Sequence, residues 1–399
     1  MEAKTKKIAC CVLTFNGADI IRDVLQSCAG YYFEAGIDVY YFDASCDDST
    51  KQVIEEYRKL GYTNLYHFHM PDASSLERTE KMMSGEWFAK DYDYIWPSKN
   101  RSFLSEAGIQ SLLKAVEEEP DVIVCSADAS PQVSVETYTD PVALYRDEAW
   151  IMTSLDTVLY RQSTVFDHAE TQEIYVGFNE FYSYIFNRMP DMEHLKVSVL
   201  RGQDMDFINS KLGHSGYNVV KTWKDFWIAV NEQLPSCYDA YKGEVIKNTA
   251  KLPWLIGGLG RTYALVQQKL IRMDNLDEVR NNWEKVSDVP FELVEKMAAG
   301  GFDIYHDMTY LNSQDEFLKF IKGLVEYVRI GAMPVSDVPF DAVIDVLMNK
   351  AEQKNAGDFD YRIVQGTLSD IQKRCIRADM TIEECCMYLQ MCFSFGLLL

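Results

Sequence analysis

Two aspartates, Asp204 and Asp206, stand two residues apart in the run RGQDMDF at residues 201–207. A carboxylate at Asp204 can act as a general base that takes the proton of an attacking hydroxyl. The pair could instead hold a divalent cation through oxygen ligands. A third role is capping of the helix that the apolar residues from Phe207 onward predict. The residues alone leave these three roles open.

A second polar cluster begins at Asp43, where a predicted strand ends, and continues as ASCDDST over residues 44–50. A carboxylate at this end of a strand can accept a hydrogen bond from the base or the ribose of a nucleotide, and we expect this role for Asp43. The N-terminus of the following helix favours anions. For Asp48 and Ser49 we expect ordinary helix capping.

His67 and His69 alternate along another predicted strand, so both imidazoles lie on one face of it. Two histidines do not complete a metal site, and the sequence offers no evident third ligand. We therefore expect a structural role for this pair.

These residues must be positioned by strands and helices that alternate over the first 130 residues. The pattern predicts strands over 8–13, 37–42, 65–70, 92–96 and 122–125, and helices over 20–28, 51–60, 76–83 and 109–118. Repeated β–α units of this length predict an α/β fold with a mostly parallel sheet. Ligands bind such sheets at the carboxyl ends of the strands, which here carry Asn16, Asp43 and the segment after Trp96.

Farther along the chain the pattern changes. Residues 131–230 mix strand-like stretches with the Asp204 run, and from about residue 240 helices follow one another. We therefore expect an α/β domain over 1–235 and an all-helical domain over 236–399. A short repeat, VSDVPF at 286–291 and again at 335–340, leaves chance and duplication both open.

Composition excludes several classes of protein. The formal net charge of −22 argues against a nucleic-acid binder and against adsorption to an anionic membrane. No stretch approaches the roughly 20 apolar residues of a transmembrane helix. The 10 cysteines form no CxxC pair, which favours reduced thiols. We expect a cytoplasmic protein, with the inner membrane face as the alternative for peripheral association.

Together these residues resemble family 2 glycosyltransferases of the GT-A fold, over about residues 7–230. Residues 12–16 (VLTFN) look like the opening strand and turn of that family, and residues 42–50 (FDASCDDST) look like its second motif. Residues 202–207 (GQDMDF) resemble its later Glu-Asp motif, with Gln203 in place of the usual Glu. The resemblance implies a GT-A-like, Rossmann-like sheet and inverting sugar transfer, with Asp204 as the base.

The resemblance also implies a nucleoside-diphosphate sugar, a UDP-sugar first, as the donor substrate. The residues expected to bind it are Thr14, Phe15, Asn16, Asp43, Ser45, Lys99, Asn100 and Arg101. Lys242 could reach the donor phosphates from the helical part, although lysines are mostly exposed at protein surfaces.

One segment departs from the family. Family members place an acidic DxD motif after the fourth strand, where it holds Mg²⁺ or Mn²⁺ on the donor diphosphate, whereas residues 97–102 here read PSKNRS. Fixed positive charge from Lys99 and Arg101 could replace the ion. The alternative is a pair of solvated loop residues in a chain that has lost catalysis. We expect metal-independent transfer, with no metal and no cofactor besides the donor.

Two other functions stay open. The missing acidic motif and the large helical domain favour a non-catalytic, glycosyltransferase-like partner that stabilises or targets an active enzyme. A nucleotidyltransferase would need a glycine-rich phosphate loop, which Gly17 alone does not supply. The acceptor could be a glycan, a lipid-linked sugar or a protein side chain. The apolar C-terminal run over 385–399 could bind a second copy or a partner chain.

Overall fold

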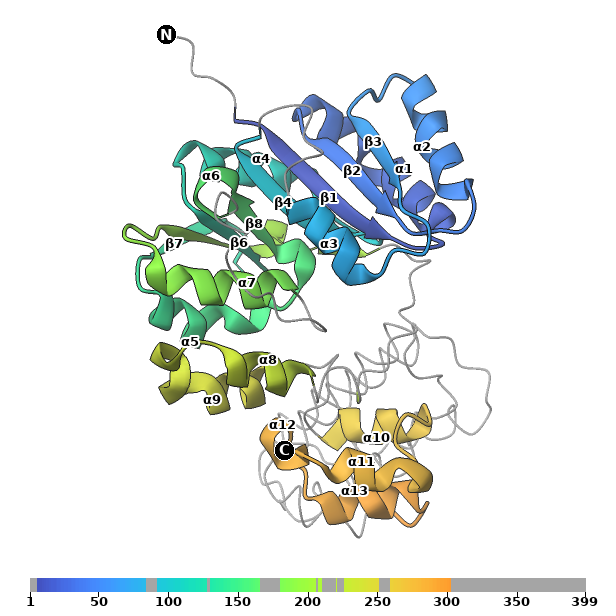
Figure 1. The fold of residues 1–399 in the computed structure, drawn as a ribbon, viewed down its shortest axis with the longest axis vertical. Helices are drawn as coiled ribbons and strands as arrows, with labels where there is room; N and C mark the ends of the chain where they lie inside the picture. The colour runs from blue at the N-terminus through green and yellow to red at the C-terminus, as the bar shows by residue number, and fades with distance from the viewer. Residues whose placement is uncertain are drawn as a thin grey trace, which may run out of the picture. The chain divides into compact units, whose positions relative to one another are not determined.

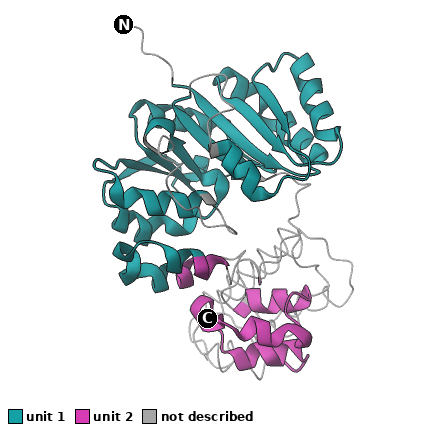
Figure 2. Cartoon of the chain, in the orientation of Figure 1, with its two compact units in different colours: residues 1–216, 230–245 teal, residues 217–229, 246–399 magenta. Residues whose placement is uncertain are grey.

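In a computed structural model of the chain, the structure describes residues 6–83, 92–127, 130–165, 180–205, 207–209, 220, 226–250 and 259–302. The chain divides into two compact units (Figure 2): unit 1 comprises residues 1–216 and 230–245, and unit 2 comprises residues 217–229 and 246–399. The site discussed below lies in unit 1.

Unit 1 is built on an eight-stranded sheet with the strand order β3-β2-β1-β4-β8-β6-β9-β7 (Figure 1). Its strands are β1 (Ile8–Thr14), β2 (Asp38–Asp43), β3 (Leu65–His69), β4 (Tyr94–Lys99), β6 (Val122–Ser126), β7 (Ser134–Tyr138), β8 (Val158–Arg161) and β9 (Val197–Arg201). The pairs β1–β2, β2–β3, β1–β4 and β6–β9 are parallel, whereas β8 and β7 run antiparallel to their neighbours. The predicted α/β fold with a mostly parallel sheet is confirmed.

Helices cover both faces of this sheet. On one face, Val12 of β1 and Leu159 of β8 share a core with α1 (Ala18–Glu34), α2 (Ser49–Lys59) and α4 (Glu106–Glu117). Successive strand residues point to opposite faces, so Tyr160 points the other way. There its ring stacks on Phe181 of α7 (Glu180–Arg188), with centroids 5.7 Å apart. Burial on both faces explains why the central strands read as continuous apolar runs.

The start of α2 shows which side chain caps it. Asp48 stands at the N-cap position but makes no side-chain hydrogen bond there. Instead, the carboxylate of Asp47 accepts hydrogen bonds from the backbone N–H and the hydroxyl of Ser49, at 3.0 and 2.5 Å. Asp48 therefore occupies the expected N-cap position without a side-chain cap, and Ser49, the other expected capping residue, bonds to Asp47.

The segment after Asp204 differs most from its expected structure. A helix was expected from Phe207, but a short 3-10 turn, η4 (Gln203–Met205), is followed by strand β10 (Phe207–Asn209). This strand pairs antiparallel with β5 (Ser102–Leu104), which directly follows β4. Phe207 also meets Trp96 edge-on, with ring centroids 6.2 Å apart. Pairing with a distant strand thus overrode the local helical pattern.

Residues 230–245 belong to unit 1 although the helical pattern begins in them. They cover the end of α8 (Trp227–Gln233) and the start of α9 (Asp239–Ala250). The side-chain oxygen of Asn231 accepts hydrogen bonds from Tyr145 of α5 (Pro141–Met152) and from Tyr182 of α7, at 2.7 and 2.9 Å. The expected domain boundary at residue 235 falls inside this segment.

The described part of unit 2 is helical. After its share of α8 and α9 it contains α10 (Leu259–Gln267), α11 (Leu276–Arg280), α12 (Trp283–Val286) and α13 (Phe291–Ala298). The second VSDVPF copy and the apolar C-terminal run over 385–399 lie outside the described residues.

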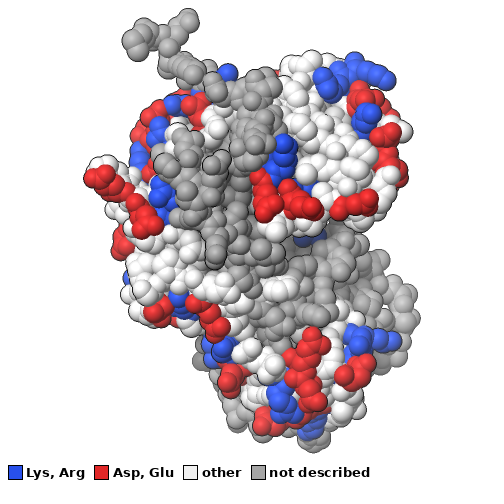
Figure 3. Space-filling model, in the orientation of Figure 1, with Lys and Arg blue, Asp and Glu red and all other residues white. Residues whose placement is uncertain are grey.

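Two observations bear on surfaces and membranes. Among the described helices, none combines the length and the apolar character that crossing a bilayer requires. On the face shown in Figure 3, acidic and basic side chains of the described residues are interspersed, without a broad basic patch.

Candidate functional site

The expected donor-binding residues other than Lys242 gather at the carboxyl ends of three adjacent strands. Thr14 at the end of β1 is paired in register with Asp43 of β2, and its neighbour Leu13 is paired with Lys99 of β4. The chain runs from β1 to β2 and β3 on one side and then places β4 on the other side of β1. Open α/β sheets bind ligands at such a topological switch point.

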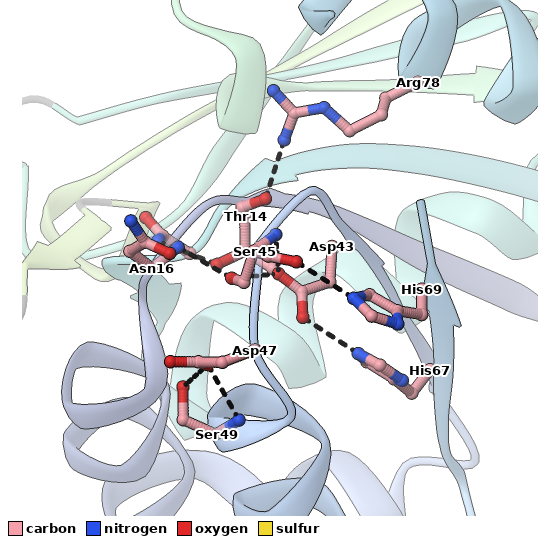
Figure 4. Close-up of polar contacts among 10 residues, drawn as sticks. Thr14, Asn16, Asp43, Ser45, Asp47, Ser49, His67, His69 and Arg78 are labelled. Carbon is pink, nitrogen blue, oxygen red and sulfur yellow. Dashed lines mark hydrogen bonds and ion pairs between the residues drawn. The ribbon is translucent and has the colours of Figure 1, made fainter. Parts of the chain in front are cut away.

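Asp43 is enclosed at this edge (Figure 4), with a side chain that is 0% exposed. One carboxylate oxygen accepts hydrogen bonds from the backbone N–H and the hydroxyl of Ser45, at 3.0 and 2.5 Å, and the other lies 3.0 Å from Nε2 of His67. Burial alone would raise the pKa of Asp43, but the hydrogen bonds from His67 and Ser45 outweigh it and lower the pKa. Asp43 is therefore an ionised group that holds the loop after β2.

Ser45 ties that loop to the one after β1. Its hydroxyl oxygen accepts a hydrogen bond from the backbone N–H of Asn16 at 2.7 Å, and its carbonyl oxygen lies 2.9 Å from Nε2 of His69. Asn16 has φ of 48°, in the left-handed region that asparagine tolerates better than most residues. Between these contacts, the ring of Phe15 is left 57% exposed, so it can stack on a planar ligand.

Three residues of this network were not assigned to the site from the sequence. His67 and His69 were expected to be structural, and they support Asp43 and Ser45 directly. Arg78, from α3 (Ser75–Met83), donates a hydrogen bond from Nη1 to the carbonyl oxygen of Thr14 at 2.7 Å (Figure 4). No local pattern could reveal Arg78, because only the fold brings α3 to the end of β1.

The turn between β4 and β5 approaches β1 closely. Nδ2 of Asn100 donates a hydrogen bond to the hydroxyl oxygen of Thr14 at 3.2 Å. A Cβ atom on Gly17 would lie 2.6 Å from both of these side-chain atoms, so a larger residue there would have to displace one of the two side chains. Arg101 follows in the same turn. It is half-buried and forms no hydrogen bond or ion pair with another residue of the described ranges.

Lys99 is already paired. Its ammonium lies 3.1 Å from a carboxylate oxygen of Asp156 and donates to the hydroxyl of Ser154 at 2.5 Å. Ser154 and Ser102 both donate hydroxyl hydrogen bonds to the same carboxylate. Burial would raise the pKa of Asp156, but the charge of Lys99 and these hydroxyls outweigh it and lower the pKa. The sequence after β4 lacks a carboxylate, and the fold supplies one from η1 (Leu155–Thr157).

Asp204 lies at the same edge of the sheet. It follows β9, which is parallel to β6. The next strand, β10, pairs with β5, so that Phe207 lies opposite Leu104 just after the β4–β5 turn. Its carbonyl oxygen accepts a hydrogen bond from the hydroxyl of Ser105 at 3.3 Å. The half-buried carboxylate has no hydrogen-bond or ion-pair partner within the described part of the chain. Asp206 lies outside the described residues.

Gly108, in the first turn of α4, controls how closely Asp204 can approach. A Cβ atom there would lie 2.4 Å from the carbonyl oxygen of Asp204 and 2.6 Å from Cγ of Leu104. Because a backbone atom would have to move, we expect Gly108→Ala to lower the free energy of unfolding by about 1–3 kcal/mol, as overpacking does. A thermal melt measures the loss, and the same change at Gly30, which has open space around it, is the control. Equal melting of both variants would contradict this close contact.

Lys242 has partners of its own. Its ammonium donates to the carbonyl oxygen of Leu234 at 2.5 Å and lies 2.7 Å from a carboxylate oxygen of Asp239. Its side chain is only 13% exposed. It therefore binds the backbone just after α8, as basic side chains commonly do at helix C-termini.

The carboxylate that the fold brings to the β4–β5 turn is already occupied. Mg²⁺ and Mn²⁺ prefer oxygen ligands such as carboxylates, but Asp156 already binds Lys99 and two hydroxyls. Within the described ranges, no group of three or more His, Cys, Asp or Glu side chains is arranged to hold a metal ion.

Acid should destabilise the protein through Asp43 and Asp156. Both have lowered pKa values in the folded state, so their stabilisation is complete above the unfolded carboxyl pKa of about 3.9 and is lost as the pH falls through the folded values. We expect the unfolding temperature to fall steeply below about pH 4. Asp156→Asn should show a shallower fall, since it removes one of the two groups. If the unfolding temperatures of the wild type and of Asp156→Asn depended on pH in the same way, the role of Asp156 would be contradicted.

Comparisons with known proteins give distant likenesses. No protein-family model and no curated protein matches the sequence. A structure of S. aureus TarS 1-349 is 13% identical, with a TM-score of 0.44, and the match covers 82% of this chain and 92% of that one. The structure of the same protein in complex with UDP is 14% identical, with the same TM-score and coverage.

A mannosyltransferase, PcManGT from Pyrobaculum calidifontis, in complex with GDP-Man and Mn²⁺, is 10% identical with a TM-score of 0.42. That match covers 75% of this chain and 88% of the other.

Proposed function

We propose that this chain is a glycosyltransferase that moves a sugar from a nucleoside-diphosphate sugar, a UDP-sugar first, to an acceptor hydroxyl. One observation carries the proposal. The switch point between β1 and β4 brings the Asp43 network and the Asn100–Arg101 turn to one edge, and the β5–β10 pairing connects Asp204 to it. These are the residues that the resemblance to family 2 glycosyltransferases marks.

The donor is bound in two parts. The loops after β1 and β2, tied together by Ser45, take the nucleoside, with Phe15 stacked on the base and Asn16 beside it. The diphosphate lies towards the turn that carries Lys99, Asn100 and Arg101. A guanidinium group binds phosphate oxygens through charge-assisted hydrogen bonds.

Transfer then proceeds in one inverting step. The carboxylate of Asp204 takes the proton from the acceptor hydroxyl while the hydroxyl oxygen bonds to the anomeric carbon. The bond from that carbon to the donor's phosphate oxygen breaks, and the nucleoside diphosphate leaves with the electron pair. Positive charge in the β4–β5 turn stabilises this leaving group without a metal ion.

The acceptor is a glycan, a lipid-linked sugar or a protein side chain. The helical residues of unit 2 position it or bind a second copy or a partner chain. We place the protein in the cytoplasm, including the inner face of the membrane. The rival is a non-catalytic partner of an active glycosyltransferase, favoured by the pairing of Lys99 with Asp156, which leaves Arg101 as the unpaired cation of the described turn.

Thermal melting with a panel of nucleotides and nucleotide sugars in EDTA tests the proposal. We expect UDP and a UDP-sugar to raise the unfolding temperature, because a ligand that binds only the folded state stabilises it. A shift that needs Mn²⁺ or Mg²⁺ would overturn metal independence. No shift with any nucleotide, with or without those ions, would overturn the proposed function.

A further inference from the structure

We propose that Asp156 is a positioning residue for donor binding: it anchors both sides of the β4–β5 turn, so that Arg101, and not Lys99, binds the donor diphosphate. This inference rests on the proposed function. It assigns different roles to two cations that stand two residues apart in the sequence.

The anchoring is visible in the contacts of one carboxylate. Lys99 lies 3.1 Å from one oxygen of Asp156, and the hydroxyl of Ser102 donates to the other. Ser154 joins the first of these contacts, because it accepts a hydrogen bond from Lys99 at 2.5 Å and donates one to Asp156 at 2.8 Å. Asn100 and Arg101 are therefore the two residues between the anchor points.

The fold explains why Asp156 lies beside this turn. The antiparallel pairing of β4 with β8 joins Tyr94 to Arg161 and Ile95 to Tyr160, and the same register continued would place Lys99 opposite Asp156. The ladder stops before Pro97, which has no N–H to donate. There η1 takes the place of a strand, and Nε1 of Trp96 donates to the carbonyl oxygen of Asp156 at 2.7 Å.

Burial keeps Lys99 in this pair. The Asp156 side chain is 4% exposed, whereas the Lys99 side chain is 34% exposed. If Lys99 turned to a phosphate, a buried carboxylate would lose the cation that compensates it, which is strongly unfavourable. Arg101 forms no ion pair with a described residue, and its planar guanidinium can bind two phosphate oxygens at once.

The contribution of the diphosphate to binding can be measured directly. It is the ratio of the dissociation constants of uridine and UDP, each obtained by calorimetry in EDTA. Arg101→Ala should lower this ratio about 10- to 100-fold, the range for hydrogen bonds to charged groups. Asp156→Asn should lower it about 2- to 10-fold, as for one misplaced hydrogen bond, while uridine alone binds unchanged.

A double-mutant cycle shows whether Asp156 acts through Arg101. In the Arg101→Ala background, Asp156→Asn and Lys99→Met should each have no further effect on the ratio. If Asp156→Asn does not fold, Lys99→Met with Asp156→Asn, which removes both charges, takes its place in the cycle.

Three outcomes would overturn the inference. An unchanged ratio in folded Asp156→Asn would make Asp156 merely structural. Additive losses from Lys99→Met and Arg101→Ala would place Lys99 on the phosphates. A wild-type protein that binds neither UDP nor GDP would overturn the proposed function itself, and with it this role. If GDP binds and UDP does not, the same ratio is taken with guanosine and GDP.

Discussion

Replacing Asp204 with Asn should lower the turnover of sugar transfer by about 10²–10⁴, the usual contribution of a positioned general base. Asparagine keeps the size of the side chain but cannot take the acceptor's proton. The dissociation constant of the donor should change little, because Asp204 acts on the acceptor. Turnover at saturating donor and acceptor measures the effect, with calorimetry for donor binding.

Asp191→Asn is the matched control for this prediction. It makes the same chemical change at an exposed position in η3 (Met189–Asp191), so turnover should stay at the wild-type level. If Asp204→Asn also retained near-normal turnover, the base would lie elsewhere, and Asp206 would become the first candidate.

Lys99→Met should destabilise the protein by about 2 kcal/mol, because it leaves the buried Asp156 carboxylate without its cation. Breaking a fully buried ion pair on one side costs about 3–5 kcal/mol. Here Lys99 is 34% exposed, and Ser102 and Ser154 still bind the carboxylate, so the effect should be smaller. Urea unfolding measures the change in the free energy of unfolding.

Two further variants make this result specific. Arg101→Met also removes a cation from this turn, but Arg101 forms no ion pair with a described residue. Its free energy of unfolding should therefore stay near the wild-type value. Adding Asp156→Asn to Lys99→Met removes the uncompensated charge and should recover much of the loss. Equal destabilisation by Lys99→Met and Arg101→Met would show that the Lys99–Asp156 pair contributes nothing specific.

Local sequence was sufficient for most of the sheet. The predicted strands and helices of the first 126 residues all appear, because buried parallel strands and amphipathic helices have strong periodic patterns. Their bounds lie within a few residues of the expected ones, except that α1 continues to Glu34. The positions of Asp43 and Asn16 followed from the same logic, since both stand where a buried strand ends. Asp204 was assigned as the base by the resemblance.

Contacts between segments that are distant in the sequence could not be predicted from local periodicity. The β5–β10 pairing made a strand of a segment that looked helical, since Phe207 could pair with Leu104 and reach Trp96. Asp156 was missed because its position depends on the register of β4 against β8, which no local pattern encodes. For the same reason, Lys99 looked like a free cation in the sequence and is paired in the fold.

The crystal structure of the chain soaked with UDP and Mn²⁺ is the most direct test of the proposed site. We predict the uracil on Phe15, the diphosphate within hydrogen-bond distance of Arg101, Lys99 still on Asp156, and no metal ion on the phosphates. UDP bound away from the ends of β1 and β4, or a Mn²⁺ ion joining its diphosphate to Asp204, would contradict the account.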